Sequence, residues 1–240
     1  MNTVLNTVVL VQARVGSTRL PKKVLADIEG QTMLERVVNR VLLAQYPDSV
    51  VIATSTNEGD NEIEQLCRTK NWPCFRGSEE DVLRRFSQAA VDYAADVVVR
   101  ITSDCPLIDP GIIDTVIDRF MSLYPDIDYV SNTLPTSYPR GLDVEVMTRD
   151  VLLKEQISCT IWREHVTQGI RKSTTYRKDN VSHEPNLNFM RWTVDTIEDL
   201  NFIRKVYQCL GEKTFYWNDV LSLLSEHPEW LIQDMQKEPV

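Results

Sequence analysis

The chain has 240 residues, of which 42% are hydrophobic and 25% charged, and its formal net charge is −9. The length suits one large globular domain, and the acidic balance argues against a general nucleic-acid-binding protein, which needs a broad basic face. The five cysteines form no CxxC pair, which argues against a zinc site or a disulfide framework, and the sequence shows neither a run of ~18 apolar residues nor a signal peptide, so we expect a cytoplasmic protein without a membrane span.

The first apolar run, Val8 to Val11, is typical of a parallel strand that is buried on both faces. No acidic residue precedes Asp27, so the loop after this strand is a local cationic patch. Its polar and basic members are Arg14, Gly16, Ser17, Arg19, Lys22 and Lys23. Because ligands of open α/β sheets bind at the carboxyl ends of the strands, the loop is expected to hold a polyphosphate. The motifs GxxxxGK[ST] and GxGxxG are absent, and a merely solvated basic surface is the alternative interpretation.

The first half of the chain then alternates helices and strands. We expect a helix over 33–42 that is capped by Thr32 and closed by Pro47, then a strand over 49–55 and a helix over 60–69. A short strand at 74–75 and a helix from Ser78 to about Tyr93 follow. A strand over 96–101 and a helix that begins at Asp109 and Pro110 complete this half. This alternation predicts an α/β fold, a three-layer α/β/α sandwich with a mostly parallel central sheet.

The second half has shorter and more polar elements. We expect a turn over 138–141, a strand over 142–147, helices over 149–158 and 161–172, strands over 173–177 and 188–193, and a helix over 196–210. No repeat, low-complexity run or flexible linker separates these elements from the rest. We therefore expect a single domain over 1–240, with 128–188 as an inserted segment.

Six sequence blocks resemble a known enzyme family. QARVGSTRLPKKVL (12–25) is similar to the opening signature of the nucleotidyltransferases that make CMP-activated sugars, the cytidylyltransferases for 3-deoxy-manno-octulosonate and acylneuraminate. The resemblance is strongest to the spore-coat polysaccharide biosynthesis protein F branch, through FRGSEEDVLRRF (75–86), VRITSDCPLIDP (99–110), YPRGLDVEV (138–146), REHVT (163–167) and RWTVDTIEDL (191–200). The blocks span nearly the whole chain in order. Lys22 departs from the pattern, because sugar-acid members usually carry glycine at this position.

The resemblance implies a nucleotidyltransferase of surface polysaccharide biosynthesis that transfers CMP from CTP to an acceptor and releases pyrophosphate. It also implies a catalytic Mg²⁺ on Asp104 and Asp195. Each of these aspartates follows an apolar segment, so each could otherwise be a simple cap. Two carboxylates, phosphate oxygens and water suit the preference of Mg²⁺ for hard ligands. Arg14 and Lys23 join the two aspartates as predicted catalytic residues.

The remaining site residues are also implied by the resemblance. CTP is expected to contact Gln12, Ala13, Arg14, Gly16, Ser17, Arg19, Lys23, Thr54, Ser55, Arg76 and Asp104, with Thr54, Ser55 and Arg76 around the base. The acceptor is expected to contact Arg140, Asp143, Glu145, His165 and Arg191. A surface arginine is the alternative for Arg76, and a structural role is the alternative for His165. The segment 128–188 would cover the acceptor and make the contact of a homodimer.

Two other functions stay open at this stage. A glycosyltransferase of similar architecture would use a nucleotide-sugar donor, but it usually carries a DxD motif, and here Asp104 is followed by Cys105 and Pro106. A non-catalytic nucleotide-binding module would not require both aspartates together with the basic loop. The acceptor itself, a sugar, a sugar acid or a phosphorylated small molecule, has no readable code, so the attacking group is a hydroxyl, a carboxylate or a phosphate.

Overall fold

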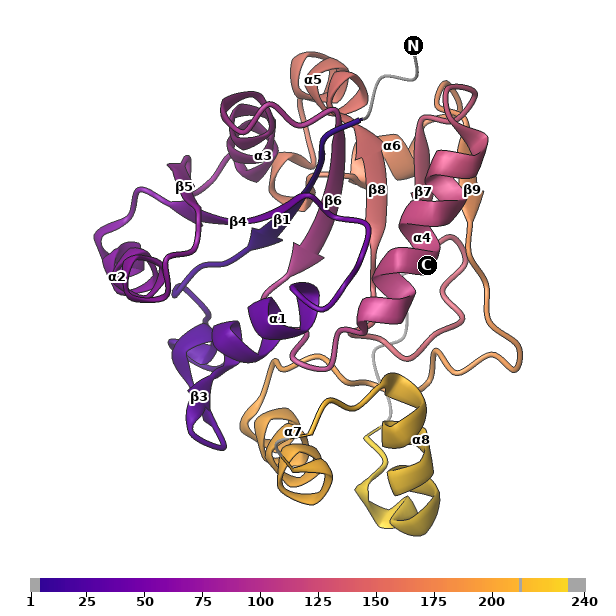
Figure 1. Cartoon of the computed structure of the whole chain (residues 1–240). Coiled ribbons are helices and arrows are strands. Elements are labelled where there is room, and N and C mark those ends of the chain that lie inside the picture. The colour runs from indigo at the N-terminus through magenta and orange to yellow at the C-terminus, as the bar shows by residue number, and fades with distance from the viewer. Residues whose placement is uncertain (1–4, 212, 233–240) are drawn as a thin grey trace.

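The computed structural model of the protein describes residues 5–211 and 213–232. Its centre is a seven-stranded sheet in the order β5-β4-β1-β6-β8-β7-β9 (Figure 1). The strands are Thr7–Gln12 (β1), Ser49–Ser55 (β4), Cys74–Gly77 (β5), Val97–Thr102 (β6), Tyr129–Ser131 (β7), Glu145–Thr148 (β8) and Lys178–Asn180 (β9). β5, β4, β1 and β6 run parallel, whereas β8 is antiparallel to both β6 and β7. The predicted mostly parallel sheet is confirmed.

Helices cover both faces of this sheet, which confirms the three-layer sandwich (Figure 1). The helices are Met33–Val41 (α1), Asn61–Lys70 (α2), Val82–Asp92 (α3), Pro110–Leu123 (α4), Arg149–Ser158 (α5), Gln168–Lys172 (α6), Ile197–Leu210 (α7) and Trp217–Glu226 (α8). Side chains of β1 alternate between the faces: Val9 and Val11 pack with α1, α2, α4, α7 and α8, and Val8 and Leu10 pack with α3, α5 and α6. A short hairpin, Asp27–Ile28 (β2) and Gln31–Thr32 (β3), lies apart from the main sheet.

Local capping explains where the helices of the first half begin. Thr32 and Glu35 form a reciprocal capping box at α1, and Asp109 caps α4 with Pro110 in its first turn. α3 is capped by Asp81 instead of Ser78, because Asp81 accepts the N–H of Arg84. α1 ends at Val41, well before the proline that was expected to close it, and a turn over 42–44 follows.

Three expectations for the second half were wrong in detail. The helix expected over 161–172 is broken into the 3₁₀ turn Arg163–His165 (η3) and α6, because Trp162 and Val166 have φ of 49° and 48°, which a right-handed helix cannot contain. The strand expected over 173–177 lies at β9, and 188–193 forms only an isolated bridge, Arg140 with Arg191. Such short polar strands are defined by their neighbours more than by periodicity.

The segment 128–188 is built into the sheet, since it supplies β7, β8 and β9, with β8 directly beside β6. α5 occupies the predicted range 149–158. No helix among the described residues is long and apolar enough to cross a membrane. The dimer contact expected for this segment stays a prediction.

Candidate active site

A polar cleft of about 290 Å³ lies at the carboxyl ends of β1 and β6. It is lined by Gln12, Arg14, Gly16, Ser17, Thr18, Arg19, Lys23, Val24, Thr102, Ser103, Asp104 and Asp195. Most of the residues expected around the triphosphate are therefore brought together here. Parallel strands end at one edge of the sheet, which places the first loop beside the TSDCP block.

The loop after β1 is held in place by Asp60, a buried residue that sequence reasoning missed. The backbone N–H of Val15 donates to Asp60 Oδ1 at 2.7 Å, and the N–H and Oγ of Ser55 donate to Asp60 Oδ2 at 3.1 and 2.5 Å. Asp60 is 2% exposed. This carboxylate therefore connects the loop to the end of β4. Ser55 contributes to the position of the loop through its hydrogen bonds to Asp60.

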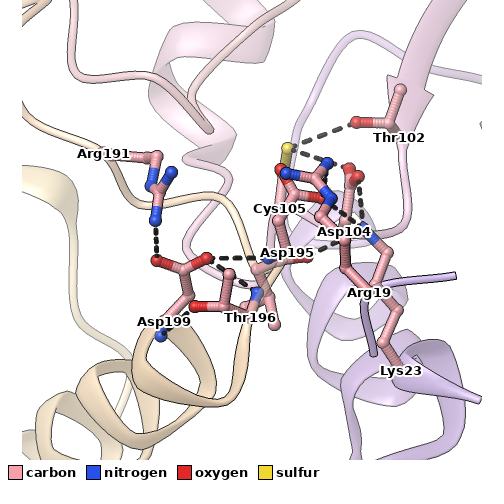
Figure 2. A network of polar contacts seen from close by, with 10 residues as sticks. Arg19, Lys23, Thr102, Asp104, Cys105, Arg191, Asp195, Thr196 and Asp199 are labelled. Carbon is pink, nitrogen blue, oxygen red and sulfur yellow. Dashed lines mark hydrogen bonds and ion pairs between the residues drawn. The ribbon is translucent and has the colours of Figure 1, made fainter. Parts of the chain in front are cut away.

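Asp104 and Asp195, far apart in sequence, meet at one cation. Lys23 Nζ lies 3.0 Å from Asp104 Oδ2, 2.9 Å from Asp195 Oδ1 and 2.8 Å from the carbonyl oxygen of Val194 (Figure 2). Arg19 Nη2 adds a second contact to Asp195 Oδ1 at 3.0 Å. Burial alone would lower the pKa of Lys23, but the two carboxylates outweigh it and hold this pKa above its usual value. Burial likewise raises the pKa of Asp104, and the Lys23 charge with nearby hydrogen bonds brings it below its usual range.

The same geometry tests whether the chain can hold the implied Mg²⁺. Two carboxylate oxygens already converge on one positive charge, so the donor set suits a hard dication. The described residues contain no cluster of three or more His, Cys, Asp or Glu that could hold a metal. A magnesium ion here would thus have two protein ligands and complete its shell with phosphate oxygens and water. Lys23 would have to move aside, because its ammonium group lies where both carboxylates converge.

Asp195 is positioned by a network that involves Arg191. Asp199 Oδ2 accepts the backbone N–H groups of Asp195 and Thr196, each at 2.9 Å, and Arg191 Nη2 donates to Asp199 Oδ1 at 2.6 Å (Figure 2). Asp199 is 1% exposed. The guanidinium of Arg191 therefore orients this buried carboxylate, and the acceptor contact expected for Arg191 stays a prediction. The spacing of Thr196 and Asp199, a capping box, was a sequence signal that could have identified Asp199.

The base pocket expected from Thr54, Ser55 and Arg76 is corrected by the structure. Thr54 and Ser55 are fully buried, and none of the three lines the cleft. The parallel register pairs Arg76 with Thr54 inside the sheet, and α2 then captures the guanidinium. Its donors bond to the carbonyl oxygens of Ser55 and Asn57 and to the side chains of Asn61 and Glu64.

Ala13, also expected at the nucleotide, is buried as well. Its backbone N–H donates to the carbonyl oxygen of Ala53 at 3.2 Å, so the residue serves the sheet.

A second cavity, of about 450 Å³, adjoins the cleft through Arg100. It is lined by Arg100, Leu134, His165, Thr167, Gln168, Arg171 and Lys172. Arg100 Nη2 donates to Gln12 Oε1, at the cleft, at 2.9 Å, and Arg14 of the cleft pairs with Glu164 at 3.1 Å, next to His165. His165 therefore lines a cavity close to the cleft, and its expected contact with the acceptor stays a prediction. Arg100 was missed, although an arginine inside the apolar run DVVVRI was a visible signal.

Glu145 is saturated by contacts within the protein. Arg100 Nη1 donates to it at 2.5 Å, and the hydroxyls of Tyr129 and Thr167 donate at 2.6 Å each. Burial raises its pKa, but Arg100 outweighs that effect and keeps the pKa below its usual range. With both oxygens engaged, Glu145 orients Arg100, which corrects its expected contact with the acceptor.

Asp143 behaves in the opposite way. Its Oδ1 is closed to solvent and has no hydrogen-bond partner among residues 5–211 and 213–232. Burial and the charge of Glu145 raise the pKa of Asp143 to about 6, although Arg140 and Arg171 act to lower it. Asp143 lies just before β8, beside the strand that carries Arg100.

Comparison with known proteins places this site in a family. The family model described as cytidylyltransferase matches residues 8–221. The chain belongs to the cytidylyltransferase family. The chain is 32% identical to the spore coat polysaccharide biosynthesis protein SpsF of Bacillus subtilis over 231 residues, which covers 92% of this chain and 94% of that protein.

Two solved structures resemble this cytidylyltransferase. A cytidylyltransferase from Leptospira borgpetersenii superposes with a TM-score of 0.92 at 29% identity, with 98% of this chain and 100% of the other covered. The CMP:2-keto-3-deoxy-manno-octonic acid synthetase complexed with CTP gives a TM-score of 0.65 at 20% identity, with 86% and 100% covered. This second likeness shows the shared fold.

Lys22, the departure from the family pattern, has a structural cost in this cytidylyltransferase. Its φ is 56°, in the left-handed region that glycine adopts freely. Its Nζ pairs with Glu62 at 2.5 Å, on the surface. The backbone conformation thus explains why glycine is the usual residue at this turn.

Proposed function

We propose that the protein transfers CMP from CTP to a small-molecule acceptor and releases pyrophosphate. The observation that carries the proposal is the convergence of Asp104 and Asp195 on one cation at the end of the basic loop. Membership of the cytidylyltransferase family supports the reaction type, and the relative of similar fold that is complexed with CTP supports the nucleotide. The relative named for spore coat polysaccharide biosynthesis supports an acceptor from surface polysaccharide biosynthesis.

The chain's own residues would bind and orient the triphosphate. Arg14, Arg19 and Lys23 would hold the β- and γ-phosphates, exchanging their present carboxylate partners for phosphate oxygens. Asp104 and Asp195 would hold Mg²⁺, which supplies charge neutralisation at the α-phosphate. Phosphoryl-group chemistry needs positioning and charge stabilisation above all, so losing one such cation costs on the order of 10²–10³ in rate by analogy with oxyanion donors.

The second cavity is the proposed acceptor site. Its lining includes Arg100, Arg171 and Lys172 but no carboxylate, so the cavity favours an acceptor that carries an anionic group. The hydrogen bond from Arg100 to Gln12 joins a residue that lines this cavity to one that lines the nucleotide cleft. An acceptor bound there would approach the α-phosphate from the β8 side of the sheet.

The test is pyrophosphate release from CTP, UTP, ATP and GTP with a panel of sugars, sugar acids and sugar phosphates, with and without Mg²⁺. We expect release from CTP with one acceptor class, and its loss when EDTA removes the metal. Equal release from ATP would contradict the CTP preference. Release of a nucleoside diphosphate from a nucleotide sugar would favour a glycosyltransferase instead, and CTP binding without turnover would favour a binding module. Sedimentation equilibrium of the same sample measures whether the protein is the proposed homodimer.

A further inference from the structure

Asp143 lies in the chain just before β8, near the Thr102 end of β6, although it is in the lining of neither cavity. The antiparallel pairing of Arg100 with Glu145 means that the chain preceding β8 runs toward the Thr102 end of β6. Thr102 lines the nucleotide cleft, whereas Arg100 lines the acceptor cavity. Leu142 and Val144 on either side of Asp143 are both fully buried in the core that contains α4, which leaves Asp143 as the polar residue between them.

Asp143 differs from its acidic neighbours in that one of its carboxylate oxygens, Oδ1, has no hydrogen-bond partner among the described residues. Asp104 and Asp195 are paired with Lys23, Glu145 accepts three hydrogen bonds, and Glu164 is paired with Arg14. Asp143 Oδ1 accepts no hydrogen bond from any residue that the structure describes, although it is closed to solvent. Asp143 is half-buried, and a carboxylate oxygen that is closed to solvent without a hydrogen bond is unfavourable for folding, so its presence near a cleft is typical of a group used in the reaction.

We propose that Asp143 is the catalytic residue that accepts the proton of an acceptor hydroxyl as that hydroxyl attacks CTP. The inference rests on the proposed function and deepens it, because it selects among the possible nucleophiles. A carboxylate or a phosphate is already ionised near neutral pH and needs no proton acceptor, whereas a hydroxyl does. The attacking group is accordingly a hydroxyl.

The step balances in atoms and electrons. The hydroxyl proton passes to an Asp143 carboxylate oxygen while an electron pair of the hydroxyl oxygen forms the new bond to the α-phosphorus. The bond from the α-phosphorus to the bridging oxygen breaks, and its electron pair leaves with pyrophosphate. Asp143 then releases the proton to solvent.

The charges around Asp143 suit this role. Burial, Glu145 and Asp104 raise its pKa, while Arg140 and Arg171 lower it, with a net value of about 6. The nearby thiol of Cys105, whose pKa is raised by burial and by the charges of Asp104 and Asp143, stays protonated and does not compete. A base with this pKa is ionised at neutral pH and still binds a proton more strongly than an ordinary aspartate.

The first experiment compares the wild-type chain with Asp143→Asn, which keeps the shape and removes the base. At saturating CTP and acceptor we expect kcat to fall by at least ~10²-fold while CTP affinity is retained, since general-base catalysis contributes roughly that much. We also expect the wild-type kcat to rise with pH through a limb near 6, and this limb to be absent in the variant. Asp118→Asn, at an exposed position on α4, is the matched control and should leave kcat unchanged.

The second experiment uses Asp143→Ala and added formate. A small carboxylate that enters the space left by the side chain can accept the proton, so we expect formate to restore part of the lost kcat. A merely structural role would give no such rescue. This variant also keeps the proposal falsifiable if Asp143→Asn does not fold.

The outcomes separate the two proposals. Pyrophosphate release by the wild-type chain together with an unchanged kcat in Asp143→Asn would overturn the role of Asp143 and leave the cytidylyltransferase function standing. A lost kcat with no rescue by formate and a retained pH limb would also overturn that role. A wild-type chain that releases pyrophosphate from CTP with no acceptor at all would overturn both.

Discussion

Two groups of carboxylates a short distance apart are treated very differently by this fold. Asp104 and Asp195 are both paired with the half-buried ammonium group of Lys23, and Arg19 adds a second ion pair to Asp195. Around Asp143, the charges of Arg140 and Arg171 lower the pKa of the carboxyl but do not offset its burial, and Oδ1 has no hydrogen-bond partner among the described residues. The comparison teaches that pairing with Lys23 keeps the pKa of Asp104 below its usual range despite burial, whereas burial without such a partner raises the pKa of Asp143 to about 6.

The largest expected effect comes from the paired group. Asp195→Asn and Asp104→Asn should each lower kcat by at least ~10²-fold, because each removes a charge from the point where both carboxylates meet. The structure separates this role from helix capping, since α7 is capped by Thr196 and Asp199. Steady-state pyrophosphate release measures the effect, with Asp118→Asn as control. If Asp195→Asn kept near-normal turnover while Asp104→Asn did not, Asp195 would have only a structural role in the turn before α7.

Asp143 is expected to make the free energy of unfolding depend on pH. The pKa of Asp143 is raised from 3.8 to about 6 on folding, so between these values the folded chain binds the extra proton and stability falls as pH rises. Asp143→Asn has no titratable group at this position, so its stability does not fall in this way as the pH rises. It should therefore be more stable than wild type by about 1–3 kcal/mol at pH 8 and equally stable near pH 3. Urea unfolding at both pH values measures the difference.

An Asn variant less stable than wild type at pH 8 would contradict this expectation. It would show that Asp143 makes a favourable interaction in the folded chain. The contrast with the Lys23 group, in which both carboxylates are matched, would then disappear.

The smallest expected effect concerns the backbone beneath the paired group. Lys22→Gly should remove the strain of the left-handed conformation, which costs a non-glycine residue roughly 1–2 kcal/mol. Part of this gain in stability is offset, because glycine has more conformational entropy in the unfolded chain and because the surface ion pair with Glu62 is lost. We expect a net gain of up to about 1 kcal/mol by thermal unfolding, with turnover retained. Lys22→Ala removes the same ion pair and keeps the strain, so it is the matched control. Equal stability of the two variants would mean that Lys22 is unstrained.

Much of the fold could be predicted because it depends on local interactions. The apolar runs of β1 and β4 predict strands that are buried on both faces. Thr32 and Asp109 predict helix starts, because each side chain accepts a hydrogen bond from a backbone N–H up to three residues ahead. The short strands β7 and β9 could not be predicted in this way, because each has only three residues and is defined by its pairing with neighbouring strands.

The site divides in the same way. The sequence by itself determined the basic loop after the first strand and, through resemblance, the two aspartates and the family. Only the tertiary structure decided which charges are paired: Lys23 lies between Asp104 and Asp195, Glu64 on α2 binds Arg76, and Asp143 Oδ1 has no hydrogen-bond partner among the described residues. The physical reason is that strand and helix propensities act over a few residues, whereas charge pairing depends on the register of strands and on burial, which bring together residues from distant parts of the chain.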